Sequence, residues 1–458
     1  MAATKRVVIV GGDAAGMSAA SQAVRVNPGL EVVAYEKGPH VSYGACGIPY
    51  YVSGEIGRWE DLLVMSPEQF QERGITVRIN HEVVAVRPAA REVTVRDTAS
   101  GRTFKDRYDV LVLATGASAD APAWQGGDLK GFFALRSLTD GIALRTFVDR
   151  SGPGRAVIVG TGFIGMEMTE AFLKLGLEVT LIGRSNRIFS AFDTEMARPL
   201  LTHLGEMGVK VYLETQVRGL EGRNGAVSGV ATDRGTFPAD LVLLSVGIRP
   251  GAALAAAAGI RLGKTGAVSV TDRMQTDTAG VYAAGDCIEV PHVVTGEKVF
   301  APLALTANRT GRIAGDNLAC ETLGRVSTQR FRGTAGTAVT KVCEFTVAQT
   351  GLSPHQADAA GFDAAVLTRQ SRSRAGYYPG GGPIWTRIVV DRKTRRLLGA
   401  QMLGKEGVAG RIDVFASALF GRMTVAEIYN LDLAYAPPYG PVYDPVIEIC
   451  GRAGLELG

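Results

Sequence analysis

The sequence is poor in the features that mark several large classes of protein. It has only 5 cysteines among 458 residues, scattered without a CxxC pair or the paired spacing of a structural zinc site. This excludes a disulfide scaffold and predicts no metal site. No apolar run reaches the roughly 18 residues of a membrane-spanning helix. Because the first predicted strand begins at Arg6 with no signal peptide before it, we expect a cytoplasmic protein.

Charge of one sign is not concentrated anywhere either. The chain has 49 basic and 45 acidic residues, a formal net charge of +4, spread along its whole length. The composition therefore predicts no nucleic-acid or membrane partner. The densest basic run, residues 392–396, is expected to be a solvated turn between strands at 385–391 and 397–402. Glycine is abundant, with 58 residues, and the length predicts about three domains.

A segment at the N-terminus recurs near residue 155. Residues 6–16 read RVVIVGGDAAG and residues 155–165 read RAVIVGTGFIG, each as strand, glycine turn and helix. A second strand with the lead-in GLEV follows each copy. The glycines permit a tight turn and bring the exposed amides of a helix N-terminus close to a pyrophosphate. The repeat therefore predicts two βαβ units that bind two dinucleotides.

The first copy departs from the glycine pattern, because Asp13 occupies the position of the second glycine. A carboxylate beside a pyrophosphate is unfavourable, so we expect this side chain to point away. Gly12 is expected to supply the conformational freedom instead.

The residue that ends the second strand of each repeat distinguishes the two nucleotides. Glu36 ends the first, and a carboxylate there accepts from a ribose hydroxyl, as suits the adenosine of FAD. The matching position is Gly183, followed by Arg184 and Ser185. No carboxylate repels a 2′-phosphate there, and a guanidinium can pair with it. We therefore predict NADPH rather than NADH in the second unit. NADH is the alternative if Arg184 is only a solvated arginine.

Two further strands are expected to complete the FAD site. Residues 108–117 end in the small residues Ala114, Thr115 and Gly116, and residues 281–286 end in Gly285 and Asp286. Both have the continuous apolar character of parallel-sheet strands. Asp286 is thus expected at the carboxyl edge of the sheet, where it can bind the ribityl chain. An ordinary loop aspartate is the alternative.

The FAD-binding domain must be discontinuous, because Asp286 follows the second repeat. We place its two segments at residues 1–149 and 271–325, with an NAD(P)H-binding domain at 150–270 between them. Residues 326–458 form a C-terminal domain, with strands at 336–345 and 385–403 and a helix at 412–421. The expected fold class is α/β, with two Rossmann-like domains followed by an α+β domain.

From Arg6 to about Pro445 the chain resembles the flavoprotein pyridine-nucleotide disulfide reductases. Residues 42–51, SYGACGIPYY, are similar to the branch with one active cysteine, which contains coenzyme A disulfide reductases, NADH oxidases and persulfide reductases. Cys46 lies where a helix should begin, with Pro49 in its first turn, so the helix dipole would stabilise its thiolate. An inert buried cysteine is the alternative, and it is our expectation for the other four cysteines.

With one thiol per site, the oxidised form is expected to be a mixed disulfide with a small thiol or a sulfenic acid. Ala14 and Ala15 stand where the oxidase and peroxidase members carry a histidine, which favours thiol chemistry. Two positions depart from the coenzyme A reductases, because Ala45 replaces an asparagine and Tyr443 replaces a basic residue. The resemblance therefore makes coenzyme A a candidate ligand without identifying the thiol.

The predicted substrate contacts follow one face of the first helix. Ser18, Gln22 and Arg25 are spaced i, i+4 and i+7, which forms one polar stripe. The stripe resembles the coenzyme A contacts of the reductases, and the resemblance adds Ser42 and Asn308. A stripe that simply faces solvent is the alternative.

The C-terminal third is similar to the dimerisation domain of these enzymes. Residues 377–380 and 435–439 resemble tyrosine motifs that reach across the dimer toward the partner's cysteine and flavin. The resemblance thus implies a homodimer in which Tyr435 and Tyr378 join Cys46 as catalytic residues, with Tyr435 assisting the leaving thiolate. Tyr439 is expected to be an ordinary interface aromatic.

The repeat and the resemblance together give the predicted cofactor contacts. Most lie in the glycine turns, at strand ends or at helix N-termini. They are Gly11, Gly12, Ala15, Gly16, Glu36, Lys37, Ser42, Val83, Ala114, Thr115, Gly116, Gly160, Gly162, Phe163, Ile164, Gly165, Glu167, Arg184, Gly247, Gly285, Asp286, Leu303, Ala304 and Ala307. Glu167 is expected to position the nicotinamide together with residues 162–165.

The predicted activity is an FAD-dependent NAD(P)H reduction of a small-molecule disulfide through a mixed disulfide at Cys46. Coenzyme A disulfide, a persulfide and a polysulfide are the candidate substrates. One alternative is an NAD(P)H oxidase that reduces oxygen through a Cys46 sulfenic acid. Another is a flavin-binding redox sensor with little turnover.

Overall fold

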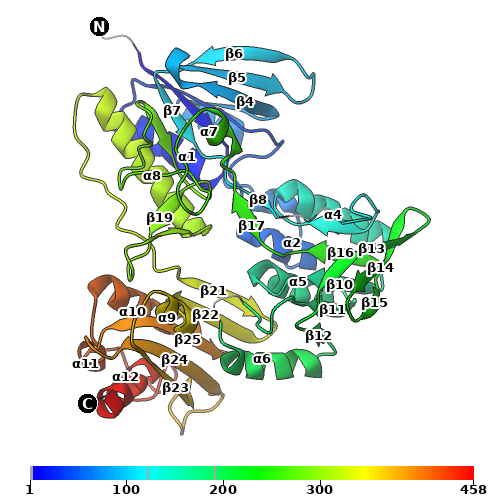
Figure 1. Cartoon of the computed structure of the whole chain (residues 1–458), viewed down its shortest axis with the longest axis vertical. Coiled ribbons are helices and arrows are strands. Elements are labelled where there is room, and N and C mark those ends of the chain that lie inside the picture. The colour runs from blue at the N-terminus through cyan, green and yellow to red at the C-terminus, as the bar shows by residue number, and fades with distance from the viewer. Residues whose placement is uncertain (1–3, 121, 123, 190–191, 458) are drawn as a thin grey trace.

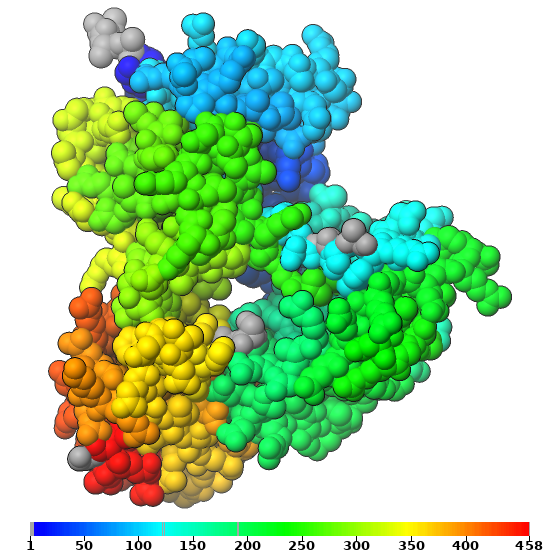
Figure 2. Space-filling view, in the orientation of Figure 1, coloured from blue at the N-terminus to red at the C-terminus, as the bar shows by residue number. Residues whose placement is uncertain are grey.

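The computed structural model describes residues 4–120, 122, 124–189 and 192–457. Its chain forms three parts, which Figure 1 shows as an upper part with the N-terminus, a part on the right and a lower part with the C-terminus. Figure 2 shows the three parts packed around a central hollow. No helix within the described ranges is long and apolar enough to cross a membrane.

The upper part is built on a five-stranded parallel sheet. Its strands lie in the order β18-β7-β1-β2-β3. Both faces are covered, which is why these strands are runs of Val, Ile, Leu and Ala rather than alternating sequences. The strands are β1 (Arg6–Val10), β2 (Glu31–Tyr35), β3 (Ile75–Arg78), β7 (Val110–Leu113) and β18 (Val281–Ala283).

The part on the right repeats this architecture strand for strand. Its parallel sheet has the order β9-β16-β10-β11-β12. The strands are β9 (Phe132–Ala134), β10 (Arg155–Val159), β11 (Glu178–Ile182), β12 (Lys210–Tyr212) and β16 (Leu241–Leu244). The predicted βαβ repeat is confirmed, with helix α1 (Ala14–Val26) matched by α5 (Phe163–Lys174).

The duplication extends beyond the segments that the sequence revealed. Each parallel sheet carries a three-stranded antiparallel sheet, in the crossover from β3 to β7 in the first and from β12 to β16 in the second. The first consists of β4 (His81–Arg87), β5 (Glu92–Asp97) and β6 (Thr103–Arg107). The second consists of β13 (Val217–Arg223), β14 (Ala226–Thr232) and β15 (Gly235–Pro238). No sequence motif indicates this similarity, because the two antiparallel sheets share only an alternation of buried and exposed residues.

Sheet pairing places the domain boundaries differently from the expected ones. Strand β9 pairs with β16, so the second domain includes residues 132–134 and helix α4 (Leu138–Ser151), ahead of the boundary expected at 150. At the other end, helix α7 (Ala253–Ala257) and residues 260–274 pack into the core of the first domain. The paired strands β8 (Ala117–Ala119) and β17 (Ile248–Pro250) are the two crossings between these domains.

Short elements connect these sheets and complete the first two parts. Helix α2 packs into the core of the second domain, although it precedes that domain in the sequence by many residues. The elements are η1 (Ala45–Gly47), α2 (Ile48–Ser53), η2 (Trp59–Leu62), α3 (Pro67–Glu72), η3 (Pro88–Ala90), α6 (Thr194–Glu206), β19 (Glu289–Pro291) and β20 (Lys298–Phe300).

The lower part is an antiparallel sheet covered by helices. Its order is β21-β22-β25-β24-β23. The strand expected at 336–345 exists as β21 but ends at Val342, and β22 follows it after a hairpin turn at Cys343, whose φ is +56°. The helix expected at 412–421 exists but begins four residues earlier. The elements are β21 (Ala338–Val342), β22 (Phe345–Gly351), α9 (Pro354–Ala359), β23 (Ala364–Arg372), β24 (Pro383–Asp391), β25 (Leu397–Gly404), α10 (Val408–Gly421), α11 (Val425–Tyr429) and α12 (Pro445–Leu457).

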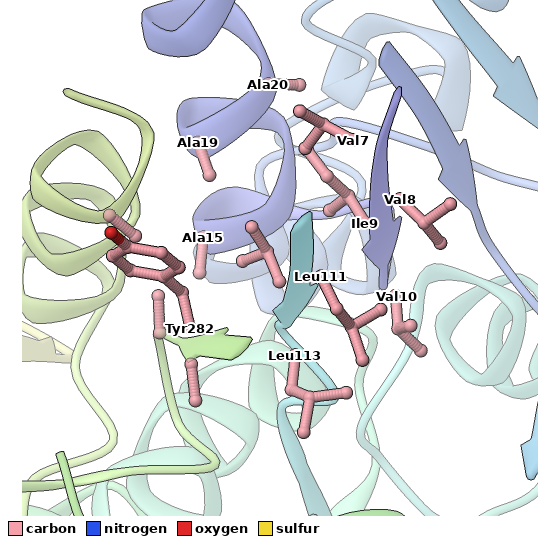
Figure 3. Close-up of a cluster of buried hydrophobic side chains, with 14 of the residues drawn as sticks. Val7, Val8, Ile9, Val10, Ala15, Ala19, Ala20, Leu111, Leu113 and Tyr282 are labelled. Atoms are coloured by element: carbon pink, nitrogen blue, oxygen red, sulfur yellow. The ribbon is translucent and has the colours of Figure 1, made fainter. Parts of the chain in front are cut away.

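Helix α8 (Ala304–Thr322) packs closely against α1 on one face of the first sheet. A Cβ atom added at Gly311 would collide with the backbone of Ala15, and one at Gly315 with the backbone of Ala19. Figure 3 shows Ala15 and Ala19 on the side of α1 that faces α8. The two glycines therefore fix how near the helices lie, and with it the position of the α8 N-terminus.

Replacing Gly311 with Ala should push α8 away from α1. We expect a loss of about 1–3 kcal/mol in the free energy of unfolding, because the added methyl group meets rigid backbone. Gly454→Ala is the control, since a Cβ at this exposed position of α12 meets nothing within 4 Å. That variant should be neutral or gain up to about 1 kcal/mol from helix propensity. Urea unfolding measures both, and equal stability of the two variants would contradict the packing argument.

Candidate active site

The two glycine turns impose the same constraint in both nucleotide-binding units. Gly11 has φ +110° and Gly160 has φ +118°, conformations that favour glycine. A side chain at Gly11 would collide with the carbonyl of Ala114, and one at Gly160 with the carbonyl of Ser245. The turn therefore passes against the neighbouring strand end, and helix amides are left open at the carboxyl edge of each sheet.

Gly12 is needed for space rather than for conformational freedom, which corrects the expectation. Its φ is not positive, but a Cβ there would lie 2.7 Å from Cβ of Glu36 and 3.0 Å from Val41. The Glu36 carboxylate accepts from the backbone amides of Gly12 and Gly38, each at 2.8 Å. Glu36 is thus held rigidly beside the turn, where it can accept from a ribose hydroxyl.

Asp13 points toward the loop that carries the candidate cysteine. Its carboxylate accepts from the backbone amide of Tyr43 at 3.4 Å and makes no capping hydrogen bond to α1. Burial raises the pKa of Asp13 to about 6, and the charge of Glu36 adds to this effect. Near pH 6 a large fraction of the molecules therefore carries a protonated, neutral Asp13, and this reduces the repulsion of a nearby phosphate.

Arg136 is a site residue that the sequence did not reveal. Its guanidinium donates to Asp286 at 2.7 Å and to the carbonyl of Ala117 at 3.2 Å. Asp286 follows Gly285, whose amide donates to Thr310 of α8 at 3.0 Å. The only local signal was the capping box of Ser137 and Asp140, which marks the start of α4. It gave no hint that the preceding arginine crosses to the first domain.

Cys46 lies in η1, directly before α2, and is the exposed cysteine of the chain's described part. Pro49 occupies the first turn of α2, as predicted. Partial burial raises the pKa of the Cys46 thiol, and the charges of Glu167, Asp13 and Asp286 raise it further. The expected stabilisation of the thiolate by the helix dipole is therefore outweighed. Three carboxylates from two domains act on this one thiol.

Glu167 lies on α5 and contacts the dimerisation domain. Its Oε1 accepts from the Thr340 hydroxyl at 2.8 Å. One turn further along, Glu170 accepts from Lys341 at 2.5 Å and from the Cys343 amide at 2.8 Å. Burial raises the pKa of Glu167, whereas the hydrogen bond from Thr340 lowers it. The acidic face of α5 is thus joined to the β21–β22 hairpin.

The polar stripe on α1 faces α8 and is not simply solvated. Ser18 donates to Asn308 at 2.8 Å, and Gln22 donates to Asp316 at 3.1 Å. Arg25 donates to Gln22 at 2.9 Å. A cleft of about 810 Å³ begins at Gln22 and is lined by Arg309, Arg312, Arg330 and Arg332. The predicted substrate contacts Ser18, Gln22, Arg25 and Asn308 are therefore brought together on one seam.

A side chain at the strand end of the second unit would have to displace two neighbouring side chains. A Cβ at Gly183 would lie 2.8 Å from Thr161 and 3.0 Å from Leu213. Arg184 is exposed and lines a cleft of about 440 Å³ together with Ser185 and Asn186. Glu214 and Asp233 line the same cleft.

The two predicted catalytic tyrosines have different partners within the chain. The hydroxyls of Tyr377 and Tyr435 lie 2.9 Å apart, both exposed, and this contact raises the pKa of Tyr435. Tyr378 instead places its ring under the guanidinium of Arg374, at 5.9 Å. Tyr377 is thus the partner of Tyr435 within the chain.

The remaining predicted contacts lie where their elements place them. Val83 is on β4 beside an irregularity in its pairing, and Gly247, with φ +137°, follows β16. Three lie at the start of α8: Leu303, Ala304 and Ala307. Ser42 lies in the loop between β2 and η1, where its backbone amide donates to the carbonyl of Gly12 at 2.8 Å. The others lie after strand ends or at the start of a helix: Lys37, Ala114, Thr115, Gly116, Gly16, Gly162, Phe163, Ile164 and Gly165. No group of three or more His, Cys, Asp or Glu side chains in the described ranges could hold a metal ion.

Comparisons with known proteins match this arrangement. Residues 5–307 match the pyridine nucleotide-disulphide oxidoreductase family, and residues 337–444 match the dimerisation domain of that family. An NAD(P)H sulfur oxidoreductase (CoA-dependent) of Pyrococcus abyssi is 41% identical over 97% of both chains.

Two solved structures are similar over almost the whole chain. An NAD-dependent persulfide reductase from A. fulgidus has a TM-score of 0.94 and 36% identity, covering 98% of this chain and 83% of that one. An engineered water-forming NADPH oxidase, a mutant of the NADH oxidase from Lactobacillus brevis, has a TM-score of 0.93 and 26% identity, covering 99% of both chains.

Asp13 should make stability depend on pH in the flavin-free protein. Its folded pKa of about 6 lies above the ordinary value of 3.8, so ionisation opposes folding. Stability should therefore fall as pH rises from about 4 to 6, by about 2–4 kcal/mol relative to Asp13→Asn. Urea unfolding at pH 4.5 and 7.5 measures the difference. Asp432→Asn, at an exposed position, should run parallel to the unmodified protein, and parallel curves for Asp13→Asn would contradict the argument.

Proposed function

The chain belongs to the pyridine nucleotide-disulphide oxidoreductase family, and from that premise we propose that it reduces a small-molecule disulfide with NAD(P)H through Cys46. The observation that carries the proposal is the position of Cys46. Its thiol lies within the electrostatic reach of Asp13 and Asp286 from the FAD-binding unit and of Glu167 from the NAD(P)H-binding unit. A sulfur at this junction can accept electrons that pass from one unit to the other.

The residues of the first unit fit FAD. The turn at Gly11 and Gly12 is a cradle that added Cβ atoms would fill, and Glu36 beside it is fixed by two amides. Asp286 follows β18 of the same sheet, and Arg136 reaches it from the second domain, so the pair can hold the flavin's phosphate and ribityl groups. FAD, when bound, relays two electrons from the nicotinamide to sulfur. The chain's own residues orient it and hold Cys46 beside it.

Cys46 serves as the nucleophile in this proposal. Its thiolate attacks the disulfide, a mixed disulfide forms and one thiol leaves. Two electrons and a proton then cleave the mixed disulfide and release a second thiol, so each cycle consumes the two electrons of one NAD(P)H. All five cysteines are free in the structure, so Cys46 forms no internal disulfide.

Coenzyme A is the proposed carrier of the substrate sulfur. The relative from Pyrococcus abyssi is described as CoA-dependent, and the A. fulgidus structure as a persulfide reductase. The seam of Ser18, Gln22 and Asn308 begins near the glycine turn and leads to an arginine-lined cleft, which suits a phosphorylated thiol. We therefore propose coenzyme A disulfide, a coenzyme A persulfide or polysulfide as substrates.

An NAD(P)H oxidase is the second candidate, because a water-forming oxidase shares the fold over 99% of both chains. The residues at the first turn oppose it. Ala14 and Ala15 offer no imidazole to handle a proton near Cys46, whereas the oxidase members carry a histidine there. Oxygen uptake in step with NAD(P)H consumption, without any disulfide, would favour the oxidase.

A homodimer completes the proposed site. The chain carries the dimerisation domain, and the exposed pair of Tyr377 and Tyr435 lies on it. In the proposed assembly this pair faces the partner's Cys46, and a tyrosine hydroxyl donates a proton to the leaving thiolate.

NADPH is the proposed electron donor. Residues 183–185 read Gly-Arg-Ser. The engineered NADPH oxidase carries five substitutions, and three of them, at consecutive positions, change Asp-Ala-Met to Ala-Arg-Ser, a similar order of residue types. The side chains of Thr161 and Leu213 crowd Gly183, so a carboxylate side chain there would have to displace them.

Replacing Arg184 with Ala should therefore raise the KM for NADPH roughly ten- to a hundredfold, since one charged hydrogen bond to the 2′-phosphate is lost. The KM for NADH should change little. Arg223→Ala, an exposed arginine at the tip of the β13–β14 hairpin, is the control and should change neither KM. Equal changes for both nucleotides, or a strong preference of the unmodified enzyme for NADH, would show that NADPH is the wrong assignment.

Replacing Cys46 with Ser tests the central proposal. FAD should stay bound and NADPH should still bleach it, but turnover with coenzyme A disulfide should fall to background, because no sulfur relay remains. Cys320→Ser is the matched control and should retain full turnover. In the unmodified oxidised enzyme, NADPH should release one small thiol per subunit. Disulfide turnover by the Cys46→Ser protein would end the proposal, and electron uptake without thiol release would favour the oxidase.

A further inference from the structure

The β21–β22 hairpin of the dimerisation domain contacts two carboxylates on one face of α5. Glu170 accepts both from Lys341 Nζ and from the Cys343 backbone amide. Glu167, three residues earlier on the same face, accepts from Thr340 alone. Glu170 is 8% exposed and Lys174 also pairs with it. The hairpin is thus anchored at Glu170, and docking does not depend on Thr340.

The carboxylates of Glu167 and Glu170 differ in how many of their oxygens accept a hydrogen bond. Both oxygens of Glu170 have partners. For Glu167, Oε1 is occupied by Thr340, while Oε2 has no hydrogen-bond partner in the described part of the chain. Glu167 follows the glycine turn at 160–165 by two residues, which places it at the edge where the second nucleotide is proposed to bind. One oxygen is thus held, and the other is left for a ligand.

We propose that Thr340 is a positioning residue for Glu167. Its hydroxyl keeps the carboxylate ionised and in one orientation, with Oε2 left to accept a hydrogen bond from the carboxamide of the nicotinamide. The inference rests on the proposed function only in placing NAD(P)H on the second unit. The hydroxyl of Thr340, and not the volume of its side chain, orients Glu167. The residue acts on the hydride-transfer step without touching the nucleotide.

The first test measures Glu167 without any cofactor turnover. A hydrogen bond to the ionised form stabilises the fold only above the pKa of Glu167, so Thr340→Val should lower the melting temperature more at pH 8 than at pH 5. Thr340→Ser keeps the donor and should behave like the unmodified protein. Thr346→Val, on the same hairpin and without a side-chain partner, should show no pH-dependent loss. In Glu167→Gln protein, the pH dependence of the Thr340→Val effect should disappear.

The second test follows flavin bleaching by NADPH in the Cys46→Ser background, where no disulfide reaction contributes. Thr340→Val should slow bleaching about three- to tenfold at pH 7. It should also move the acid limb of the rate profile to higher pH, because the pKa of Glu167 rises when its donor is lost. Thr340→Ser should restore the profile. NADP⁺ affinity, measured by dialysis, should weaken in parallel.

The proposal fails if Thr340→Val matches the unmodified protein in both tests, or if Thr340→Ser is as defective as Thr340→Val. The first result would show that the hydroxyl does not act on Glu167, and the second that only the volume of the side chain matters. Bleaching needs no disulfide, so either result leaves reduction through Cys46 untouched. Absence of disulfide turnover in the unmodified protein, with normal bleaching by NADPH, would instead contradict the proposed function alone.

Discussion

The nucleotide sites depend on two turns that have no room for a side chain. At Gly11 and at Gly160 the backbone passes against the carbonyl of the neighbouring strand end, with φ of +110° and +118°. Gly16 and Gly165 then let each helix approach its own turn, because a Cβ at either would collide with the carbonyl of the turn glycine. This contact aims the helix N-terminus at the sheet edge. Every other site group, from Glu36 to Asp286, is positioned relative to that edge.

The parts that the sequence predicted are those in which local chemistry determines local structure. Strand, turn and helix can be recognised at residues 6–16 because apolar period, glycine position and helix pattern occur within one short segment. The same holds for Gly183 and Arg184, whose place at a strand end follows from the repeat. The turn of the β21–β22 hairpin was not predicted, because Cys343, with φ +56°, is not a residue type that indicates a turn.

The missed features all depend on contacts between distant segments. Arg136 reaches Asp286 across 150 positions of sequence, and Thr340 reaches Glu167 across 173. Neither pair has a local signature, since an arginine before a helix and a threonine in a strand are ordinary. The α1–α8 seam is similar: Gly311 and Gly315 read as small helix residues until α1 lies against them. The boundary expected at residue 150 was misplaced for the same reason, because only the pairing of β9 with β16 shows which sheet β9 belongs to.

The acidic surroundings of Cys46 bear on the choice between disulfide and oxygen chemistry. Burial and three carboxylates raise the pKa of this thiol, so a proton is retained on Cys46 more strongly than on an ordinary small thiol. When a mixed disulfide at Cys46 is cleaved, the sulfur with the lower pKa leaves as the better leaving group, which is the small thiol. Attack on a disulfide and oxidation to a sulfenic acid both require the Cys46 thiolate, so the same charges disfavour both steps. In the proposed reductase the carboxylates therefore bear on which sulfur is released. An oxidase that cycles through a sulfenic acid has no counterpart to this effect, because its cycle releases no thiol.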